Sequence, residues 1–204
     1  MIKVMDKGKE NYDNVIKEAL NFVKAKLRLG GHDYEHVMRV HKLAISVGRK
    51  LGADEIVLSL AALLHDVGRV KEGNLHHALI SAEIAKDFLE SKGLSKEVID
   101  KVVEAIEAHS YSLGKKASSL EAKILSDVDK LDALGAIGIA RVFLYSGAKG
   151  RSLSESLKHF EEKILKLPSL IYLDELKVVA ERRAKFVKEF LKELKLELEL
   201  KDLE

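Results

Sequence analysis

The chain has 204 residues, of which 47% are hydrophobic and 33% are charged, and its 35 basic residues nearly balance 33 acidic ones. This composition is typical of a globular domain, whereas a dedicated nucleic-acid binder would carry a marked excess of basic residues. Cysteine is absent, which excludes disulfides, thiolate catalysis and cysteine-ligated zinc or iron–sulfur sites.

No segment has the length and apolarity of a membrane span or a leader peptide. The longest apolar stretches, 56–64 and 133–140, are far shorter than the roughly 20 residues that cross a bilayer. The first ten residues, MIKVMDKGKE, lack the apolar core of a signal peptide. We therefore expect a cytoplasmic protein that contacts no membrane. Gln and Thr are also absent while Lys, Glu and Leu dominate, which indicates a thermophilic source.

The first half of the chain predicts helices. The sequence contains one proline, Pro168, among residues of high helix propensity. Apolar residues recur at the helical period over 12–29 and over 32–52, and each segment closes on glycine. A third segment, 55–67, is apolar almost all round, so we expect it at the centre of the fold.

The second half continues the helical pattern. A helix is expected from Ser119 without a break through SDVDKLDALGAIGIARVFLY, which ends at Tyr145. Further helices are expected over 76–91, over 96–109 with Ser95 as its N-cap, and over 170–200. The alternation in KLELELK, 195–201, is strand-like, but the flanking helix outweighs it. Because no repeat or linker interrupts the pattern, the prediction is a single all-α domain over residues 1–204.

Histidines and carboxylates cluster in the first half of the sequence. Seven of the eight histidines fall between 32 and 109, several of them beside Asp or Glu. The pair His65-Asp66 ends the most hydrophobic segment, where an unpaired buried carboxylate is unfavourable. A bound metal ion compensates for that burial, and a salt bridge or a helix cap is the structural alternative. Imidazoles with carboxylates suit Mn²⁺, Fe²⁺, Co²⁺, Ni²⁺ and Zn²⁺.

Three aspartates, Asp127, Asp129 and Asp132, interrupt an otherwise apolar later helix. Asp129 and Asp132 are three residues apart and therefore share a helix face. A solvated face is the structural alternative for Asp127 and Asp132.

The order of His36, His65-Asp66 and Asp129 resembles the HD superfamily of metal-dependent phosphohydrolases. The surrounding sequence is similar to that family in five segments: GHDYEHVMRV (31–40), LAALLHDVGR (60–69), HALISAEIA (77–85), IEAHSYS (106–112) and SDVDKLDALGAIGIAR (126–141). HFEEKILKL (159–167) and AERRAKFVKEFL (180–191) resemble a small single-domain subgroup with nucleotide-hydrolysing members. The resemblance covers roughly residues 12–192 and implies an all-α, single-domain HD-type helical bundle.

The resemblance implies one divalent metal ion held by four side chains, those of His36, His65, Asp66 and Asp129. The ion would be Mn, Co, Ni, Fe, Zn or Mg, with Mn or another first-row transition metal favoured. It would lower the pKa of a bound water toward about 7 for attack on phosphorus. Asp66 is expected to orient that water, and Lys130, beside a ligand, is expected to act in catalysis.

Substrate-binding residues are expected among the remaining polar side chains of these segments: His32, Arg69, His77, His109, Arg141 and Lys163. His77 and His109 match positions that supply extra ligands in binuclear relatives, and we expect them to line the substrate pocket here. Arg182 and Arg183 are weaker candidates for contacting phosphate, and Asp132 is expected to support an imidazole or Lys130. For each cation, a solvated charge that stabilises its helix is the alternative.

The expected activity is hydrolysis of a nucleotide or related phosphate ester, with release of pyrophosphate from nucleoside triphosphates favoured. A nucleoside monophosphate phosphatase and a non-catalytic metal- or nucleotide-binding regulatory module are the alternatives. The expected partner is thus a small-molecule phosphate ester and not a nucleic acid. We expect a monomer or a homodimer.

Overall fold

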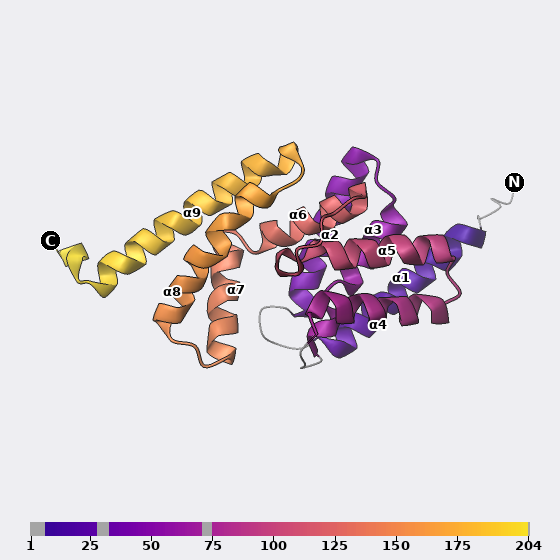
Figure 1. Cartoon of the computed structure of the whole chain (residues 1–204), viewed down its shortest axis with the longest axis horizontal. Helices are drawn as coiled ribbons and strands as arrows, with labels where there is room; N and C mark the ends of the chain where they lie inside the picture. Colours follow the sequence, from indigo (N-terminus) through magenta and orange to yellow (C-terminus); the bar gives the residue numbers. More distant parts are fainter. Residues whose placement is uncertain (1–6, 28–32, 71–74, 204) are drawn as a thin grey trace, which may run out of the picture. The chain divides into compact units, whose positions relative to one another are not determined.

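The computed structural model describes residues 7–27, 33–70 and 75–203 (Figure 1). Helices and turns make up these ranges, and no strand occurs within them, which confirms the all-α class. The chain divides into two compact units, Met1–Ser126 and Asp127–Glu204. The single domain expected over the whole chain stays a prediction.

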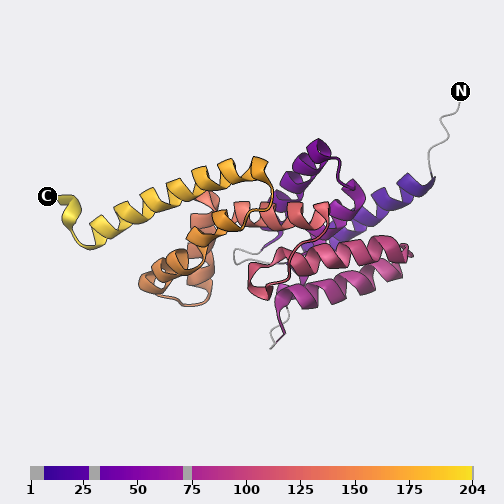
Figure 2. The same cartoon turned by 45° about the horizontal axis from the view of Figure 1, so that its top comes forward.

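The first unit is built around a central helix. It contains α1 (Lys7–Lys26), α2 (Tyr34–Leu51), α3 (Glu55–Leu64), α4 (His77–Ser91), α5 (Lys96–His109), a 3-10 turn at Tyr111–Leu113 and the first half of α6 (Leu120–Asp132). α3 packs against α1, α2, α4 and α5, and every residue from Val57 to Leu64 is buried. α4 and α5 lie side by side in both views (Figures 1 and 2). The central position predicted for the third helix is confirmed.

α3 ends earlier than the sequence predicted, at Leu64 instead of Val67. A 3-10 turn, Val67–Val70, follows and lies against α4. Gly68 makes this approach possible: its N–H donates to Ser81 Oγ at 2.9 Å, and a Cβ on Gly68 would stand only 2.5 Å from the Ser81 nitrogen. The turn Val67–Val70 is therefore held close to α4.

The second unit contains the rest of α6, then α7 (Gly135–Ala148), α8 (Leu153–Glu162), a 3-10 segment (Ile164–Leu170), α9 (Asp174–Leu198) and a final 3-10 turn (Lys201–Leu203). α9 packs against α7 and the 3-10 segment. Phe143 of α7 contacts Phe160 of α8 and Phe190 of α9, with ring centroids 5.8 and 6.0 Å apart. These aromatic contacts join the three helices.

Three expectations for the second half are corrected. The helix expected without a break from Ser119 is two helices. Gly135 takes a left-handed φ of 71°, and the helical hydrogen-bond pattern ends at Asp132. The last helix begins at Asp174 instead of 170. α8 was not predicted, although its capping box, Ser152 with Glu155, is visible in the sequence. The segment 195–198 of KLELELK is helical, as the flanking pattern indicated.

No single helix in the described ranges is long and apolar enough to span a membrane. α6 and α7 reach that length and composition only when taken together, and the chain bends by 74° between them.

Candidate metal centre

The centre begins at the first turn of α2. Asp33 is the N-cap of this helix, and its Oδ1 accepts a hydrogen bond of 3.0 Å from the backbone N–H of His36. An aspartate at this position satisfies an N–H of the first turn and favours the helix start. His36 consequently stands in the first turn of α2, and its side chain is fully buried.

His65 and Asp66 follow the last turn of α3, and both are buried. Nδ1 of His65 lies 2.8 Å from the carbonyl oxygen of Ala62. Because a carbonyl oxygen only accepts, Nδ1 carries the proton and Nε2 keeps its lone pair. In this tautomer an imidazole binds a metal ion through Nε2.

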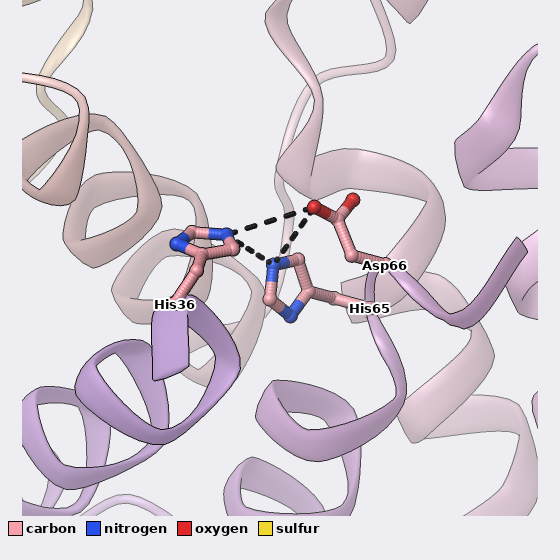
Figure 3. A group of neighbouring side chains, drawn as sticks. All are labelled: His36, His65 and Asp66. Atoms are coloured by element: carbon pink, nitrogen blue, oxygen red, sulfur yellow. Dashed lines mark hydrogen bonds and ion pairs between the residues drawn. The ribbon is translucent and has the colours of Figure 1, made fainter. Parts of the chain in front are cut away.

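Three donor atoms converge between α2 and the end of α3 (Figure 3). Nε2 of His36 lies 3.2 Å from Nε2 of His65, and Oδ2 of Asp66 lies 3.6 and 3.8 Å from these nitrogens. Two ligands of one ion, each about 2.1 Å from it, are roughly 3.0–3.4 Å apart at octahedral to tetrahedral angles. The observed spacing is close to these values, so the group fits a divalent cation.

A second group of imidazoles faces the other oxygen of Asp66. Nε2 of His77, at the start of α4, lies 3.7 Å from Oδ1, and Nε2 of His109, at the end of α5, lies 3.8 Å from it. Nδ1 of His109 donates to the carbonyl oxygen of Ile106, one turn back in α5. His109 therefore donates from the same ring nitrogen as His65, and its Nε2 faces Asp66.

Arg69 links the two groups. Its Nε lies 2.7 Å from Oδ2 of Asp66, and its Nη2 donates to Nε2 of His77 at 3.0 Å. Arginine is only a donor, so His77 accepts here and is neutral. Burial, reinforced by the positive charge of Arg69, lowers the pKa of His77 to about 3. The sequence placed Arg69 near the centre, but its ion pair with Asp66 was not predicted.

Two of the three aspartates in α6, all of which belong to the second unit, contact other helices or the segments ahead of them as follows. Asp127 accepts hydrogen bonds from the backbone N–H groups of Tyr172, at 2.9 Å, and Leu173, at 2.8 Å, ahead of the first turn of α9. Oδ2 of Asp132 lies 3.1 Å from Nη1 of Arg141. Asp127 and Asp132 are buried, so neither lies on a solvated helix face, which was the structural alternative to a role in the site.

Lys130 and Tyr172 adjoin each other in the second unit. Lys130 is buried, and its Nζ lies 5.6 Å from the centroid of the Tyr172 ring. Burial lowers the pKa of Lys130, while the charges of Asp127 and Asp129 oppose that shift. The sequence analysis did not single out Tyr172. The one feature that could have indicated it is that an aromatic residue stands just before the last helix. The roles expected for Asp129 and Lys130 stay predictions.

The remaining candidates for contact with the substrate lie apart from one another in the sequence. Lys163 is half-buried at the C-cap of α8, and Arg182 is exposed on α9. Nη1 of Arg183 donates to the carbonyl oxygen of Leu131 near the end of α6, at 2.5 Å. His32 lies outside the described residues. The substrate contacts expected of Lys163 and His32, and that of Arg141, stay predictions.

A family model covers the part of the chain that carries the histidines and aspartates of the candidate metal centre. The model of the HD domain matches residues 33–134, which is half of the chain. The chain belongs to the HD-domain family. The matched range includes His36, His65, Asp66 and Asp129, and the resemblance drawn from the motifs is confirmed.

Relatives of this HD protein match over most of its length. The YpgQ protein of Bacillus subtilis is 36% identical over 176 residues, which are 82% of this chain and 85% of YpgQ. The crystal structure of YpgQ in complex with ADP has a TM-score of 0.72 at 30% identity and covers 93% of this chain and 95% of that one. An HD-superfamily hydrolase from Bacillus thuringiensis has a TM-score of 0.69 at 34% identity, covering 94% and 98% of the two chains. This chain thus has the fold of an HD-superfamily hydrolase, with a His/Asp cluster that can hold a metal ion.

Proposed function

We propose that this HD protein is a metal-dependent phosphohydrolase that acts on nucleotides and releases pyrophosphate from nucleoside triphosphates. The observation that carries the proposal is the convergence of the His36 and His65 Nε2 atoms on the Asp66 carboxylate in an HD fold. These three residues would hold one divalent ion, with Asp129 as the fourth ligand that the resemblance implies. A bound ion of this kind supplies Lewis acidity and lowers the pKa of a water.

The remaining groups around Asp66 suit the substrate. Nε2 of His77 already accepts from Arg69, which favours a place for His77 and His109 in the substrate pocket over a second metal site. Arg69 uses Nε and Nη2 on Asp66 and His77, and a guanidinium has further N–H donors for a phosphate oxygen. Arg69 would thereby both orient the Asp66 carboxylate and neutralise phosphate charge.

Further residues of the proposed machinery belong to the second unit. We propose that Lys130 neutralises charge on the reacting phosphate, since it follows Asp129 directly in the chain. Arg141 and Lys163 are retained as phosphate-binding candidates, although Arg141 already pairs with Asp132. For Arg183, the bond to Leu131 favours a structural role at the end of α6.

The relative's ligand supports a nucleotide as substrate. YpgQ was crystallised in complex with ADP and shares its fold with this chain. A site that accepts a nucleoside diphosphate has room for a chain of phosphates, which favours di- or triphosphates over the monophosphatase alternative.

A product assay tests the proposal. Metal-stripped protein is reloaded with Mn²⁺, Co²⁺, Ni²⁺, Mg²⁺ or Zn²⁺ and offered nucleoside mono-, di- and triphosphates. We expect pyrophosphate from triphosphates with at least one transition metal and no turnover by Asp66→Asn, which keeps the side chain's shape but removes its charge. His159→Gln is the matched control, since His159 lies on α8 and is none of the proposed metal ligands or substrate-binding residues.

The products separate the alternatives. Free phosphate from monophosphates would make the protein a nucleotidase. Saturable metal and nucleotide binding without turnover under any condition would favour the non-catalytic regulatory module and reject the enzyme.

A further inference from the structure

The start of α4 and the end of α5 meet beside Asp66. Only residues 92–95 connect the two helices, so they run antiparallel and α4 begins where α5 ends. His77, the first residue of α4, and His109, the last of α5, consequently contact each other, with ring centroids 5.6 Å apart. Both direct Nε2 toward Oδ1 of Asp66. The relative position of these two helix ends therefore sets the geometry of this side of the centre.

One hydrogen bond joins the N-cap of α4 to the 3-10 turn that follows α5. Nε2 of His76 lies 2.8 Å from Oγ of Ser112, which belongs to that turn. On its other ring nitrogen, Nδ1, His76 accepts from the backbone N–H of Ala78 at 3.2 Å and so caps α4. Because Nδ1 accepts, the ring proton is on Nε2, which donates to Ser112. The bond thus has a defined direction and lies within the first unit.

His76 and Ser112 also contact the residues that adjoin the centre. The ring of His76 packs on the ring of His77, with centroids 4.3 Å apart. Oγ of Ser112 lies 3.2 Å from Oγ of Ser110, which directly follows His109 in the chain. A continuous path of contacts therefore leads from the first residue of α4 to the residue after the end of α5.

We propose that His76 and Ser112 are positioning residues that hold His77 and His109 in place on the substrate side of the centre. This inference rests on the proposed function, which assigns those two imidazoles to the substrate pocket. Neither positioning residue takes part in the chemistry. Because their bond is exposed, water competes for both partners and its net contribution is modest. Its loss should therefore weaken binding several-fold and not abolish it.

The proposal distinguishes the two oxygens of Asp66. His36 and His65, the proposed ligands of the ion, approach Oδ2. The bond between His76 and Ser112 supports the residues that face Oδ1. Its loss should consequently weaken nucleotide binding and leave the affinity for Mn²⁺ at the value of the wild type. A general loss of structure would weaken both together.

Three substitutions isolate the bond. Ser112→Ala removes the acceptor, whereas Ser112→Thr keeps a hydroxyl and should behave like the wild type. His76→Asn removes the ring nitrogen that donates to Ser112 but keeps a good helix cap, because asparagine is among the preferred N-cap residues. If the bond itself matters, the double variant with Ser112→Ala and His76→Asn should be no worse than either single variant.

The first unit contains a matched control. Oγ of Ser59 lies 2.7 Å from Nε2 of His41, so a second histidine–serine bond joins α3 to α2. Neither residue belongs to the proposed machinery. Ser59→Ala should lower the stability of the protein, because it removes the partner of a half-buried imidazole, and should leave nucleotide affinity unchanged.

Calorimetric titration of ADP into the Mn²⁺-loaded protein tests the proposal without turnover. Kd for ADP should rise roughly 2- to 10-fold in Ser112→Ala, in His76→Asn and in the double variant, the range expected for one hydrogen bond. Kd for Mn²⁺, titrated into the metal-stripped proteins, should not change. Unchanged ADP affinity, additive losses in the double variant, or equal weakening of ADP and Mn²⁺ would each overturn the proposal.

Histidine ¹⁵N NMR of the metal-free protein tests the contacts without any nucleotide. His76 should carry its proton on Nε2, and Ser112→Ala should shift the ring signals of His76 and His77, whereas Ser59→Ala should shift neither. Absence of a shift at His77 would show that Ser112 does not act on the centre and would overturn the proposal. If the shift occurs but the wild type hydrolyses no nucleotide, the proposed function fails while the positioning of His77 stands.

Discussion

The orientation of three imidazoles in the centre is set by the groups that surround them. His65 and His109 each donate from Nδ1 to a carbonyl oxygen one turn back in their own segment, so both direct Nε2 toward Asp66. His77 accepts from Arg69 and stays neutral. The centre therefore offers imidazole nitrogens and one carboxylate, the set that a first-row divalent ion binds.

The low pKa of His77 predicts an acid sensitivity of the metal-free protein. The pKa of this group falls from 6.5 to about 3 in the folded protein. Between these values the unfolded chain binds a proton at His77 that the folded protein does not, so the free energy of unfolding decreases as the pH falls through this window. In His77→Asn, the proton uptake on unfolding near pH 5 should be lower by about one proton, as measured from urea midpoints at several pH values.

A residual slope is expected in the variant, because burial also lowers the pKa of His41 and of His159. Parallel stability curves for the wild type and His77→Asn would contradict the assignment of this proton to His77.

Residue types and order were enough to predict which imidazoles and carboxylates belong to the centre of the first unit. A histidine and an aspartate at the end of an apolar helix have few ways to be buried together, so the His65-Asp66 pair pointed to a metal ion or an ion pair. The structure contains the ion pair, with Arg69, in the same place. The sequence did not predict that pairing, because several cations nearby in the sequence could have paired with Asp66. The turn at Val67–Val70 is what brings Arg69 to the carboxylate.

At the scale of elements, the approach of that turn to α4 positions the centre. Gly68 lies against the backbone at the start of α4, where a Cβ would meet the Ser81 nitrogen at 2.5 Å and the His77 carbonyl oxygen at 2.7 Å. Both neighbours are main-chain atoms, which do not move aside as a flexible side chain does. The turn that carries Arg69 is thereby held against the helix that begins with His77.

Gly68→Ala should consequently destabilise the protein and disturb the centre. We expect a loss of about 1–3 kcal/mol from the overpacked contact, and weaker Mn²⁺ binding, because the turn must move away from α4. Gly147→Ala is the matched control: Gly147 is in α7, and a Cβ there meets nothing within 4 Å. It should be neutral or stabilising by up to about 1 kcal/mol. Equal effects of the two substitutions in urea denaturation would show that the close approach is not tight in solution.

Helix periods and caps predicted most elements, and each failure has a physical cause. Gly135 did not stand out from Gly138 in the sequence, because both glycines fit a continuous apolar helix. Its left-handed φ places the chain against Arg183, with the Arg183 Cγ 3.2 Å from where a Cβ would be. That contact comes from α9, far along the chain, and could not be read from the local pattern. α8 was missed because its capping box precedes a short, mostly polar segment.

For the molecule as a whole, charge is balanced locally as well as in total. Several exposed lysines pair with a glutamate four residues away on the same helix, as Lys86 does with Glu90, Lys101 with Glu97, and Lys185 with Glu189. Such pairs contribute little to stability, but they interrupt a continuous basic surface. The net charge of +2 and this pairing argue against strong binding of a polyanion.

We therefore predict no strong binding of nucleic acid at physiological salt. Fluorescence anisotropy with a labelled single-stranded RNA should show a Kd no tighter than about 10⁻⁴ to 10⁻⁶ M at 0.15 M salt, the non-specific range. Tighter binding that falls steeply with salt concentration would contradict this prediction and point to a basic surface that the balanced composition conceals.

The central claim is that the buried His/Asp cluster binds a divalent metal ion, and calorimetric titration of Mn²⁺ into metal-stripped protein tests it most directly. We predict saturable binding of one ion per chain, weakened at least about 100-fold in His65→Gln and unchanged in His159→Gln. Identical isotherms for the wild type and His65→Gln, with both proteins folded by circular dichroism, would contradict the claim that His65 and its neighbours form a metal site.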